Sequence, residues 1–451
     1  MPPPRNSPGL IDRLRAEGGP AAHAALEALM LIGDIAAPDL AFLLEDPDPL
    51  LAGAAAEALG EIGSGVTVRP LLAALARPEP EVREAAAWAL SQIGRAALPG
   101  LITALGDPAP HARAAAAAAL ARQAVSDPHA AMECLPALLA LPGDPSAEVR
   151  EAGVAALSSC ARDGEPLPML IDGLLSWLEA PEAHARGAAI RALGQVAANH
   201  AETGARVAPM LLKALSDPDR EVRDVAAHAL GRAAGGRALL VEWLVEPLAA
   251  QLTHPDPALR LSASEALGRL GDPGAVDGLL HALWDENGEV RAMAAWALGE
   301  TGILDPRAAP ALLDALYQPD ARLQEAACAA LGAVEDVGSV DVLLQALGHV
   351  DASVRQAAAR ALERIAARDQ DARSLALPGL INALADPDHV VRRIAARALG
   401  QAGDEAALEA LIAVLQDPDE GTRAAAAQAL GLLDAEDAIP ALIAALRSGA
   451  C

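Results

Sequence analysis

One phrase recurs thirteen times along the chain, at intervals of about 31 or about 37 residues. It is clearest at residues 386–392, where Asp-Pro-Asp-His-Val-Val-Arg leads into Ala-Ala-Arg-Ala-Leu-Gly at residues 395–400. Such a period is typical of stacked helical units that bury their apolar faces against one another, so function must be sought where the units differ. The arginine position is occupied in turn by Ala22, Ala52, Arg83, Arg113, Arg150, Arg186, Arg223, Arg260, Arg291, Gln324, Arg355, Arg392 and Arg423.

The phrase marks the boundary between two helices. A proline stands five residues before the arginine in most units, and it marks a helix end because proline inside a helix loses a hydrogen bond. The next residue is usually one whose side-chain oxygen can cap a starting helix. These predicted caps are Asp48, Ser146, Asp219, Asp256, Asn287, Asp320, Asp351, Asp388 and Asp419. We expect glycine to close many of the helices that follow, as at Gly60, Gly94, Gly268 and Gly400.

Each unit contains a pair of helices. After the cap, apolar residues recur at spacings of three and four, as at Val82, Ala85, Ala89 and Ile93, which predicts an amphipathic helix. Another apolar segment, for example residues 70–75, precedes each proline. We call the helix formed by the segment before the proline the outer helix, and the helix that follows the phrase the inner helix. The pattern predicts an all-α fold, an α-α superhelix (solenoid) of about thirteen such pairs.

The same alignment predicts the organisation of the chain. Its terminal units are expected to be atypical, as in other solenoids. We expect a disordered tail at residues 1–7, an N-terminal capping helix pair at 8–34 with Leu10, Ile11 and Leu14 facing inward, the repeat solenoid at 35–437, and a C-terminal capping helix at 438–451. The longer intervals should lengthen connections or outer helices.

This pattern resembles the HEAT-repeat superfamily over nearly the whole chain, and specifically the short bacterial form named after phycobilisome lyase subunits. The resemblance implies that the Asp and Arg of the phrase form a ladder of structural contacts inside the turn, such as Asp217 with Arg223 and Asp386 with Arg392. It also implies two alternative functions, because the same repeat occurs in scaffolds and in a bilin lyase.

The charge of the chain restricts its partners. Asp and Glu number 61 against 34 Lys and Arg, which gives a formal net charge of −27. A solenoid that binds DNA or RNA needs a basic stripe, so we expect protein partners and no nucleic acid. Hydrophobic segments are too short to span a membrane, and residues 1–7 lack the apolar segment of a secretion signal, so a cytoplasmic location is expected.

Aromatic residues make up only 2% of the chain, so their positions are informative. The fifth residue after the arginine should point away from the core, since each helical residue turns by about 100°. This column contains Trp88 and Trp296. Tryptophan often dominates interface energy, so both are candidate partner anchors; the alternative is that each ring fills space above neighbouring alanines.

Other aromatic residues lie on the outer helices. Trp284 and Tyr317 occupy matching places at the ends of successive outer helices, which suggests either a second aromatic patch or helix-end packing. Trp177 and Trp243 lie within apolar outer-helix segments and are expected in the core.

Arginines gather late in the chain. Arg360, Arg364, Arg393 and Arg397 fall within residues 354–397, where eight arginines face five acids. This local reversal in an acidic chain is a candidate site for an anion or an acidic partner, although a solvated helix face produces the same pattern.

Residues that carry chemistry form no constellation. The ten histidines, among them His111, His184, His228, His281 and His389, are scattered over units and registers, and the chain lacks the His-Glu dipeptides of HEAT-repeat metal hydroxylases. No phosphate-binding glycine loop or Gly-x-Ser-x-Gly elbow is present. We expect no catalytic residue, metal or cofactor.

The four cysteines, Cys134, Cys160, Cys328 and Cys451, have no metal-binding spacing. Cys134 and Cys160 fall on the two helices of one unit and are expected to be neighbours, as reduced packing residues. Together these observations favour a non-catalytic protein-interaction scaffold that binds its partner on a concave inner-helix surface. The alternative is a bilin-lyase-like enzyme or a chaperone that handles tetrapyrroles, for which no residue can be assigned.

Overall fold

The computed structural model describes residues 20–161, 166–235, 238–301, 305, 307–433 and 436–448. These residues form helices joined by short turns, with no β-strand among them, which confirms the predicted all-α fold. The chain divides after Ala233 into an N-terminal and a C-terminal unit. The predicted tail at residues 1–7, the inward-facing residues before 20 and the last cysteine lie outside the described residues.

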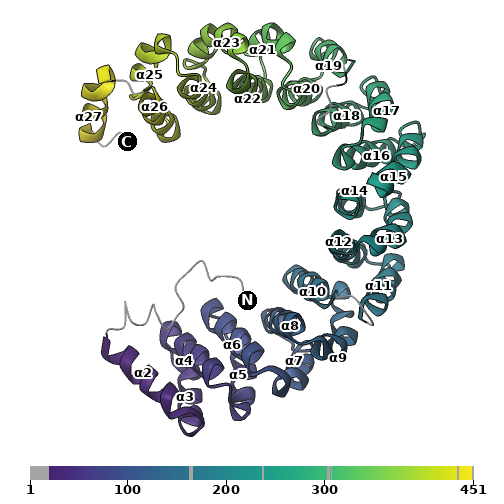
Figure 1. Ribbon diagram of the computed structural model, residues 1–451, viewed down its shortest axis with the longest axis vertical. Coiled ribbons are helices and arrows are strands. Elements are labelled where there is room, and N and C mark those ends of the chain that lie inside the picture. Colours follow the sequence, from purple (N-terminus) through teal and green to yellow (C-terminus); the bar gives the residue numbers. More distant parts are fainter. Residues whose placement is uncertain are drawn as a thin grey trace. The chain divides into compact units, whose positions relative to one another are not determined.

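The N-terminal unit begins with α2 (Pro20–Ile32) and continues with alternating outer and inner helices (Figure 1). Its outer helices are α3 (Ala37–Phe42), α5 (Val68–Ala74), α7 (Leu98–Ala104), α9 (Pro128–Leu138), α11 (Pro166–Ser176) and α13 (Ala201–Ala214). Its inner helices are α4 (Pro49–Ile62), α6 (Pro80–Ile93), α8 (Pro110–Ser126), α10 (Ala147–Cys160), α12 (Ala183–Asn199) and α14 (Arg220–Ala234).

The C-terminal unit repeats this alternation, with successive inner helices packed side by side in one layer and outer helices in a second (Figure 1). Its outer helices are α15 (Ala238–Gln251), α17 (Val276–Ala282), α19 (Ala308–Leu316), α21 (Val340–Ala346), α23 (Gln370–Ala383), α25 (Leu408–Val414) and α27 (Ile439–Ser448). Its inner helices are α16 (Pro257–Leu270), α18 (Gly288–Glu300), α20 (Ala321–Val334), α22 (Ala352–Arg368), α24 (His389–Ala402) and α26 (Glu420–Leu432).

Single 3₁₀ turns join many of these helices. They are η1 (Gly33–Ile35), η2 (Leu43–Glu45), η3 (Gly65–Thr67), η4 (Gly94–Ala96), η5 (Leu141–Gly143), η6 (Trp177–Glu179), η7 (Pro273–Ala275), η8 (Val337–Ser339), η9 (Glu405–Ala407) and η10 (Glu436–Ala438). The longer intervals lengthen the outer helices, since α13 and α23 contain 14 residues each whereas α5 and α25 contain 7.

Most inner helices begin at the expected caps. The carboxylate of Asp388 accepts hydrogen bonds from the N–H groups of Val390 (2.9 Å) and Val391 (3.1 Å). The expectation was wrong for Ser146, whose side chain makes no capping hydrogen bond. Asp144 already holds that turn by accepting from the N–H of Ser146 (2.8 Å). Equivalent capping bonds are accepted by Asp48, Asp219, Asp256, Asn287, Asp320, Asp351 and Asp419.

Of the four glycines expected to close helices, only Gly94 is a C-cap, with a φ of 73°. Gly60, Gly268 and Gly400 instead lie inside α4, α16 and α24. Those helices end in the left-handed conformation three residues later, at Gly63, Gly271 and Gly403. The prediction was therefore wrong at three positions, and glycine must serve another purpose there.

The internal glycines allow successive inner helices to approach closely. A Cβ atom on Gly400 would lie 2.6 Å from the Cα of Ala429 in the next inner helix. One on Gly60 would lie 2.7 Å from the Cα of Ala89. Carbon atoms that are not bonded attract best at about 3.5–4.0 Å and repel strongly at these distances, so only glycine fits. The same contact to an alanine of the next inner helix recurs at Gly194, Gly268, Gly299 and Gly332.

The arginine of the phrase links one repeat to the next. Arg186 donates from Nη1 to the carbonyl oxygen of Ala180 in its own turn (2.8 Å). Its Nε and Nη2 donate to the two carboxylate oxygens of Asp217 in the following repeat (2.7 Å each). Only 12% of the Arg186 side chain and 10% of the Asp217 side chain are exposed. The same bidentate pair joins Arg113 to Asp144, Arg260 to Asp285, Arg355 to Asp386 and Arg392 to Asp417.

The contacts inside the turn that the resemblance implied are present, and they are made through main-chain carbonyl groups. Arg223 contacts Asp217 as expected, with its Nη1 donating to the main-chain carbonyl oxygen of Asp217 (2.8 Å). Arg392 likewise binds the carbonyl oxygen of Asp386 (2.9 Å). The carboxylates are turned toward the preceding repeat, where an arginine offers two parallel N–H groups. The arginines therefore brace their own turns, as expected, and also join successive repeats, which was not expected.

The carboxylates of the ladder are held in their charged form. Burial would raise the pKa of Asp217, but hydrogen bonds from Arg186 and from the N–H of Asp219 outweigh it, so the pKa lies below its usual value. The pKa values of Asp144, Asp285 and Asp417 are lowered in the same way.

Two repeats lack the arginine and compensate differently. Where the chain has Ala52, Arg77 of the next repeat reaches back and donates to the carbonyl oxygens of Leu44 (3.1 Å) and Asp46 (3.1 Å). Asp46 stands six residues before Ala52, so its carbonyl is the one that an arginine would have bound. Arg77 itself occupies the place of the ladder aspartate. The guanidinium of Arg77 thus takes the place of both the missing arginine and the ladder aspartate.

At Gln324 the substitution is simpler. Its Nε2 donates to the carbonyl oxygen of Leu316 (2.9 Å). The ladder aspartate of the next repeat is replaced by His349, which accepts from the N–H of Asp351 (3.0 Å). Neither half of the ion pair remains, so no carboxylate is left without a cation at this step.

Two repeats have the arginine without the carboxylate: that of Arg150, and that of Arg223, where the next repeat has His254 and the buried Nε also has no hydrogen-bond partner. Arg150 donates to the carbonyl oxygens of Asp144 (2.8 Å) and Pro145 (2.9 Å), but its buried Nε has no hydrogen-bond partner. The corresponding position of the next repeat, six residues before Arg186, is Ala180. The ladder is therefore incomplete at both steps.

The glycine contact predicts opposite effects at two equivalent positions. Gly400→Ala should lower the free energy of unfolding by about 1–3 kcal/mol, because the new Cβ overlaps Ala429. Gly431 has the same register in the last inner helix, and a Cβ there meets nothing within 4 Å. Gly431→Ala should thus be neutral or stabilising by up to about 1 kcal/mol. Urea denaturation followed by circular dichroism measures both, and equal effects would contradict the close-contact argument.

Completing the ladder should stabilise the protein. Ala180→Asp supplies the missing carboxylate for Arg150 and an acceptor for the N–H of Glu182, so the free energy of unfolding should rise by about 1 kcal/mol. The same substitution in an Arg150→Leu background is the control. A gain that persists without Arg150 would show that the ion pair is not its source.

The lowered aspartate pKa values predict a loss of stability in acid. Each of these carboxyls titrates lower in the folded chain than in the unfolded chain, where its pKa is about 3.9. Their contribution is complete above that pH and disappears as the pH falls through the folded values. Asp217→Asn should cost about 2–4 kcal/mol at neutral pH and much less near about pH 2. Thermal unfolding at both pH values tests this, and an equal cost would exclude the ionic contribution.

Candidate functional site

The two tryptophans of the inner-helix column are half-buried. A Cβ on Gly60 would lie 2.7 Å from Cζ3 of Trp88, and one on Gly268 would lie 2.9 Å from Cζ3 of Trp296. Each ring therefore covers a glycine of the preceding inner helix. This geometry favours the space-filling alternative for most of each ring, while the remaining part faces solvent.

The same column contains two buried acids. The Arg269 guanidinium lies 5.6 Å from the centre of the Trp296 ring and donates to Glu265 (3.0 and 2.8 Å). Glu265 is only 8% exposed, and Glu57 at the same register only 6%. The expectation that this column points away from the core was wrong at these two positions. A glycine three residues later lets the next inner helix approach closely enough to cover each glutamate.

The outer-helix aromatics are more exposed than expected. Trp284 and Tyr317, at the ends of α17 and α19, are 60% and 69% exposed. Trp243 was expected in the core, but 48% of it is exposed. Trp177 is half-buried, and its Nε1 donates to the carbonyl oxygen of Leu139 (2.7 Å).

The late arginines lie on two neighbouring inner helices, α22 and α24, and all four are exposed. Arg397 donates to both oxygens of Glu363 (2.5 and 2.7 Å), and these hydrogen bonds raise the pKa of Arg397. Arg360 and Arg364 make no ion pair or side-chain hydrogen bond with the residues that the structure describes. Arg393 lies near Asp419, the cap of the next inner helix, whose pKa is lowered by hydrogen bonds with Thr422 and also by the charge of Arg393.

A hollow of about 420 Å³ lies among the C-terminal halves of α20, α22 and α24. Gly332, Ala333 and Ala367 line it with small apolar groups, and Arg364 and Arg397 are among the charged residues that surround it. Two of the arginines predicted from the sequence thus meet at one depression. Sequence reasoning missed the hollow because it depends on small residues from three different repeats.

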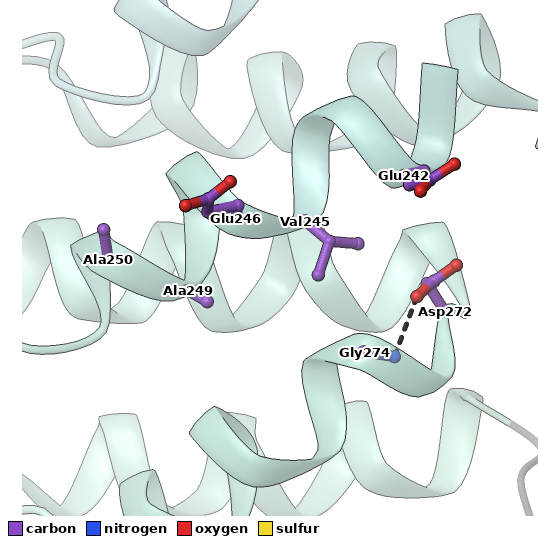
Figure 2. A pocket seen from close by; sticks show the side chains of 7 residues that line it. All are labelled: Glu242, Val245, Glu246, Ala249, Ala250, Asp272 and Gly274. Atoms are coloured by element: carbon purple, nitrogen blue, oxygen red, sulfur yellow. Dashed lines mark hydrogen bonds between the residues drawn. The ribbon is translucent and has the colours of Figure 1, made fainter. Parts of the chain in front are cut away.

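A second hollow of the C-terminal unit lies between α15 and η7 and has a volume of about 530 Å³. Figure 2 shows Glu242 and Asp272 at one end, with Val245 between them and Glu246. The Asp272 carboxylate accepts from the N–H of Gly274 (2.8 Å) and so caps its own turn. This depression is acidic, in line with the charge of the whole chain.

The cysteines form no metal site within the described residues. The Sγ atoms of Cys134 and Cys160 lie 3.9 Å apart in the core, which confirms that they are neighbours. Their hydrogen bond lowers the pKa of Cys134, whereas burial raises the pKa of Cys328 to about 12. No group of three His, Cys, Asp or Glu residues that could hold a metal occurs in the described parts of the chain. Of the helices described, none combines the length and apolar character needed to cross a membrane.

The fold is similar to those of several solved proteins. The structure of Kap121p matches with a TM-score of 0.57 and 18% identity over 90% of this chain. Kap95p, solved with RanGDP, matches with a TM-score of 0.56 and 15% identity over 98% of this chain. A complex of Kap95 with Nup1 gives a TM-score of 0.58 at 15% identity over 94% of this chain. This chain spans 50% of the Kap121p chain and 64–66% of the Kap95 chains.

No curated protein matches the sequence. The family model described as HEAT repeats matches residues 7–91, 37–121, 171–241, 245–326, 309–376 and 377–450. These segments cover most of the chain, and they include most of the helix pairs and ladder arginines described above; α9 and α10 lie in the interval between two matched segments. The chain belongs to the HEAT-repeat family.

Proposed function

We propose that this protein is a non-catalytic scaffold that binds a protein partner through the exposed side of its inner helices. The observation that carries the proposal is the set of exposed arginines on α22 and α24. The ladder arginines form structural bonds, whereas Arg360 and Arg364 make no ion pair or side-chain hydrogen bond with the described residues. Exposed cations without an intramolecular partner are free to form ion pairs with another molecule.

The fold supports the same proposal. A stack of helix pairs offers a long surface on which neighbouring repeats contribute equivalent positions, and solenoids use such surfaces for binding. Proteins of similar fold have been solved with protein partners, such as Kap121p bound to Pho4p and Kap121p bound to the SUMO protease Ulp1p. Pho4p and Ulp1p are partners of Kap121p. Only the shared architecture supports the proposal for this chain.

The aromatic residues contribute less than the sequence alone suggested. Because Trp88 and Trp296 cover glycines, only the parts of their rings that remain exposed are available to a partner. Trp284 and Tyr317 are more exposed but lie at the ends of outer helices, so we propose them as secondary contacts. The arginines therefore rank first among the candidate residues and the inner-helix tryptophans second.

Site-specific photo-cross-linking tests which layer of helices binds the partner. A photoreactive residue placed at Ala155 in α10 or Ala329 in α20, both exposed on inner helices, should cross-link one partner protein. The matched controls are Met169 in α11 and Leu375 in α23, which are 43% and 52% exposed on outer helices. Because solenoid partners contact one layer, these positions should give no cross-link. Mass spectrometry identifies the products.

Two outcomes would contradict the proposal. Cross-links of equal yield from outer and inner positions would indicate non-specific encounter. Cross-links from outer positions alone would place the partner on the other layer of helices.

A further inference from the structure

The hollow among α20, α22 and α24 has the composition of a site for carboxylates. Its small lining residues leave room at the surface, and its charged residues are Arg364, Arg368 and Arg397 with Glu335 and Glu363. Three arginines against two glutamates leave a surplus of one positive charge. This surplus stands out in a chain whose formal net charge is −27. The site is therefore locally complementary to acidic groups.

Both glutamates are already engaged and serve to orient arginines. Glu363 accepts from Nε and Nη2 of Arg397 (2.5 and 2.7 Å), which leaves the Nη1 of Arg397 outside this pair. Glu335 lies 3.4 Å from Nε of Arg368. A guanidinium has five N–H donors, so each tethered arginine retains donors for a ligand while its position is fixed. Arg364 lies between them without a partner among the described residues.

The backbone at Glu335 supports a role for this arrangement. Glu335 has a φ of 57° and is the one non-glycine residue with positive φ among the described residues. It closes α20 eleven residues after Gln324, the same register at which Gly63, Gly271 and Gly403 close their helices. A side chain in this conformation is disfavoured relative to glycine. The chain thus tolerates strain at the one cap whose side chain reaches Arg368, and strain of this kind concentrates at functional sites.

The neighbouring turns extend the cationic surface. Arg360 precedes Arg364 by one helical turn on α22, and Arg393 precedes Arg397 by one turn on α24. Residues four apart on a helix share a face, and packed helices lie about 8–10 Å apart. The exposed guanidinium groups can therefore engage several carboxylates along one segment of a partner.

We propose that this hollow binds an acidic, Asp- or Glu-rich segment of a protein partner, whose carboxylates pair with Arg364 and with the free donors of Arg368 and Arg397. This inference rests on the scaffold function proposed above and names the chemistry of the partner at one site. The occupant is a peptide and not a nucleic acid, because no aromatic side chain lines the hollow for base stacking.

Fluorescence anisotropy with the full chain and a labelled octaglutamate peptide tests the inference. Binding should be measurable at low ionic strength and should weaken as salt is added. The double variant Arg360→Gln/Arg364→Gln should weaken binding by about tenfold or more, because two exposed guanidinium contacts are lost. Arg364→Lys, which keeps the charge but loses the bidentate geometry, should give an intermediate loss.

The matched control removes the same charge elsewhere. Arg307→Gln/Arg322→Gln neutralises two arginines of the same unit that are 59% and 75% exposed and lie outside the hollow. This variant should bind octaglutamate within about twofold of the unmodified chain. Circular dichroism melting checks that all variants are folded, and should the double variant be unfolded, Arg364→Lys alone decides.

The inference is overturned if octaglutamate does not bind, if both double variants lose affinity equally, or if an oligothymidylate of equal charge binds more tightly. These results are independent of the photo-cross-linking experiment. Inner-helix cross-links without octaglutamate binding would leave the scaffold function standing and remove the acidic partner. Octaglutamate binding without inner-helix cross-links would support an acidic ligand at the hollow and count against the inner-helix scaffold.

Discussion

The stacking of this protein depends on a guanidinium that binds in two directions at once. Arg186 holds its own turn through a carbonyl oxygen and holds the next repeat through the carboxylate of Asp217. Only a planar group with several fixed N–H donors can satisfy both acceptors together, so lysine could not replace arginine here. Because both partners are almost fully covered, removing one leaves a buried charge in the other. At two steps both positions change, since Arg77 serves the repeat of Ala52 and His349 follows Gln324, whereas Arg150 and Arg223 remain without a carboxylate partner.

Local features of this fold could be predicted from the sequence. Apolar spacings of three and four indicated the helices, and Asp388 was expected at the start of α24, where its carboxylate caps the first turn. Features that depend on the neighbouring repeat could not be predicted in the same way. Gly400 was expected to be a helix end because glycine favours caps, whereas its place is set by Ala429 of the next inner helix. The contact of Arg223 with Asp217 was expected, but the ion pair of Asp217 with Arg186 was not, because Arg186 is 31 residues away.

At the candidate site, too, features set within one helix could be predicted, and features set by the neighbouring repeat could not. Exposure of Arg360, Arg364 and Arg393 followed from helical periodicity, since it needs only the register of each helix. The burial of Glu265 did not, because it depends on how closely Trp296 and its helix approach over Gly268. A signal for this approach is present in the sequence. Glycine recurs eight residues after the phrase arginine, and alanine recurs six residues after the arginine of the following repeat.

Close packing also limits where the inner surface can vary. Positions at the glycine contact must stay small, and most ladder positions keep the arginine or the aspartate, whereas the residues between them on the inner helices differ from repeat to repeat. The four late arginines occupy such variable positions. In this way the scaffold can change its partner chemistry without changing its stacking, and the hollow beside Arg364 is an example.

The ladder gives the stack a chemical polarity. Cutting the chain between α12 and α13 would leave the C-terminal edge of one fragment with the guanidinium of Arg186 and the N-terminal edge of the other with the carboxylate of Asp217. The cut also separates Asp172 and Glu179 on the first fragment from Arg206 and Lys213 on the second, so each edge carries charges of both signs beside uncovered apolar helix faces. Two such fragments are complementary in shape and in the positions of their charges, which two copies of the same fragment are not. Split halves of this protein should for this reason recognise each other in the native order.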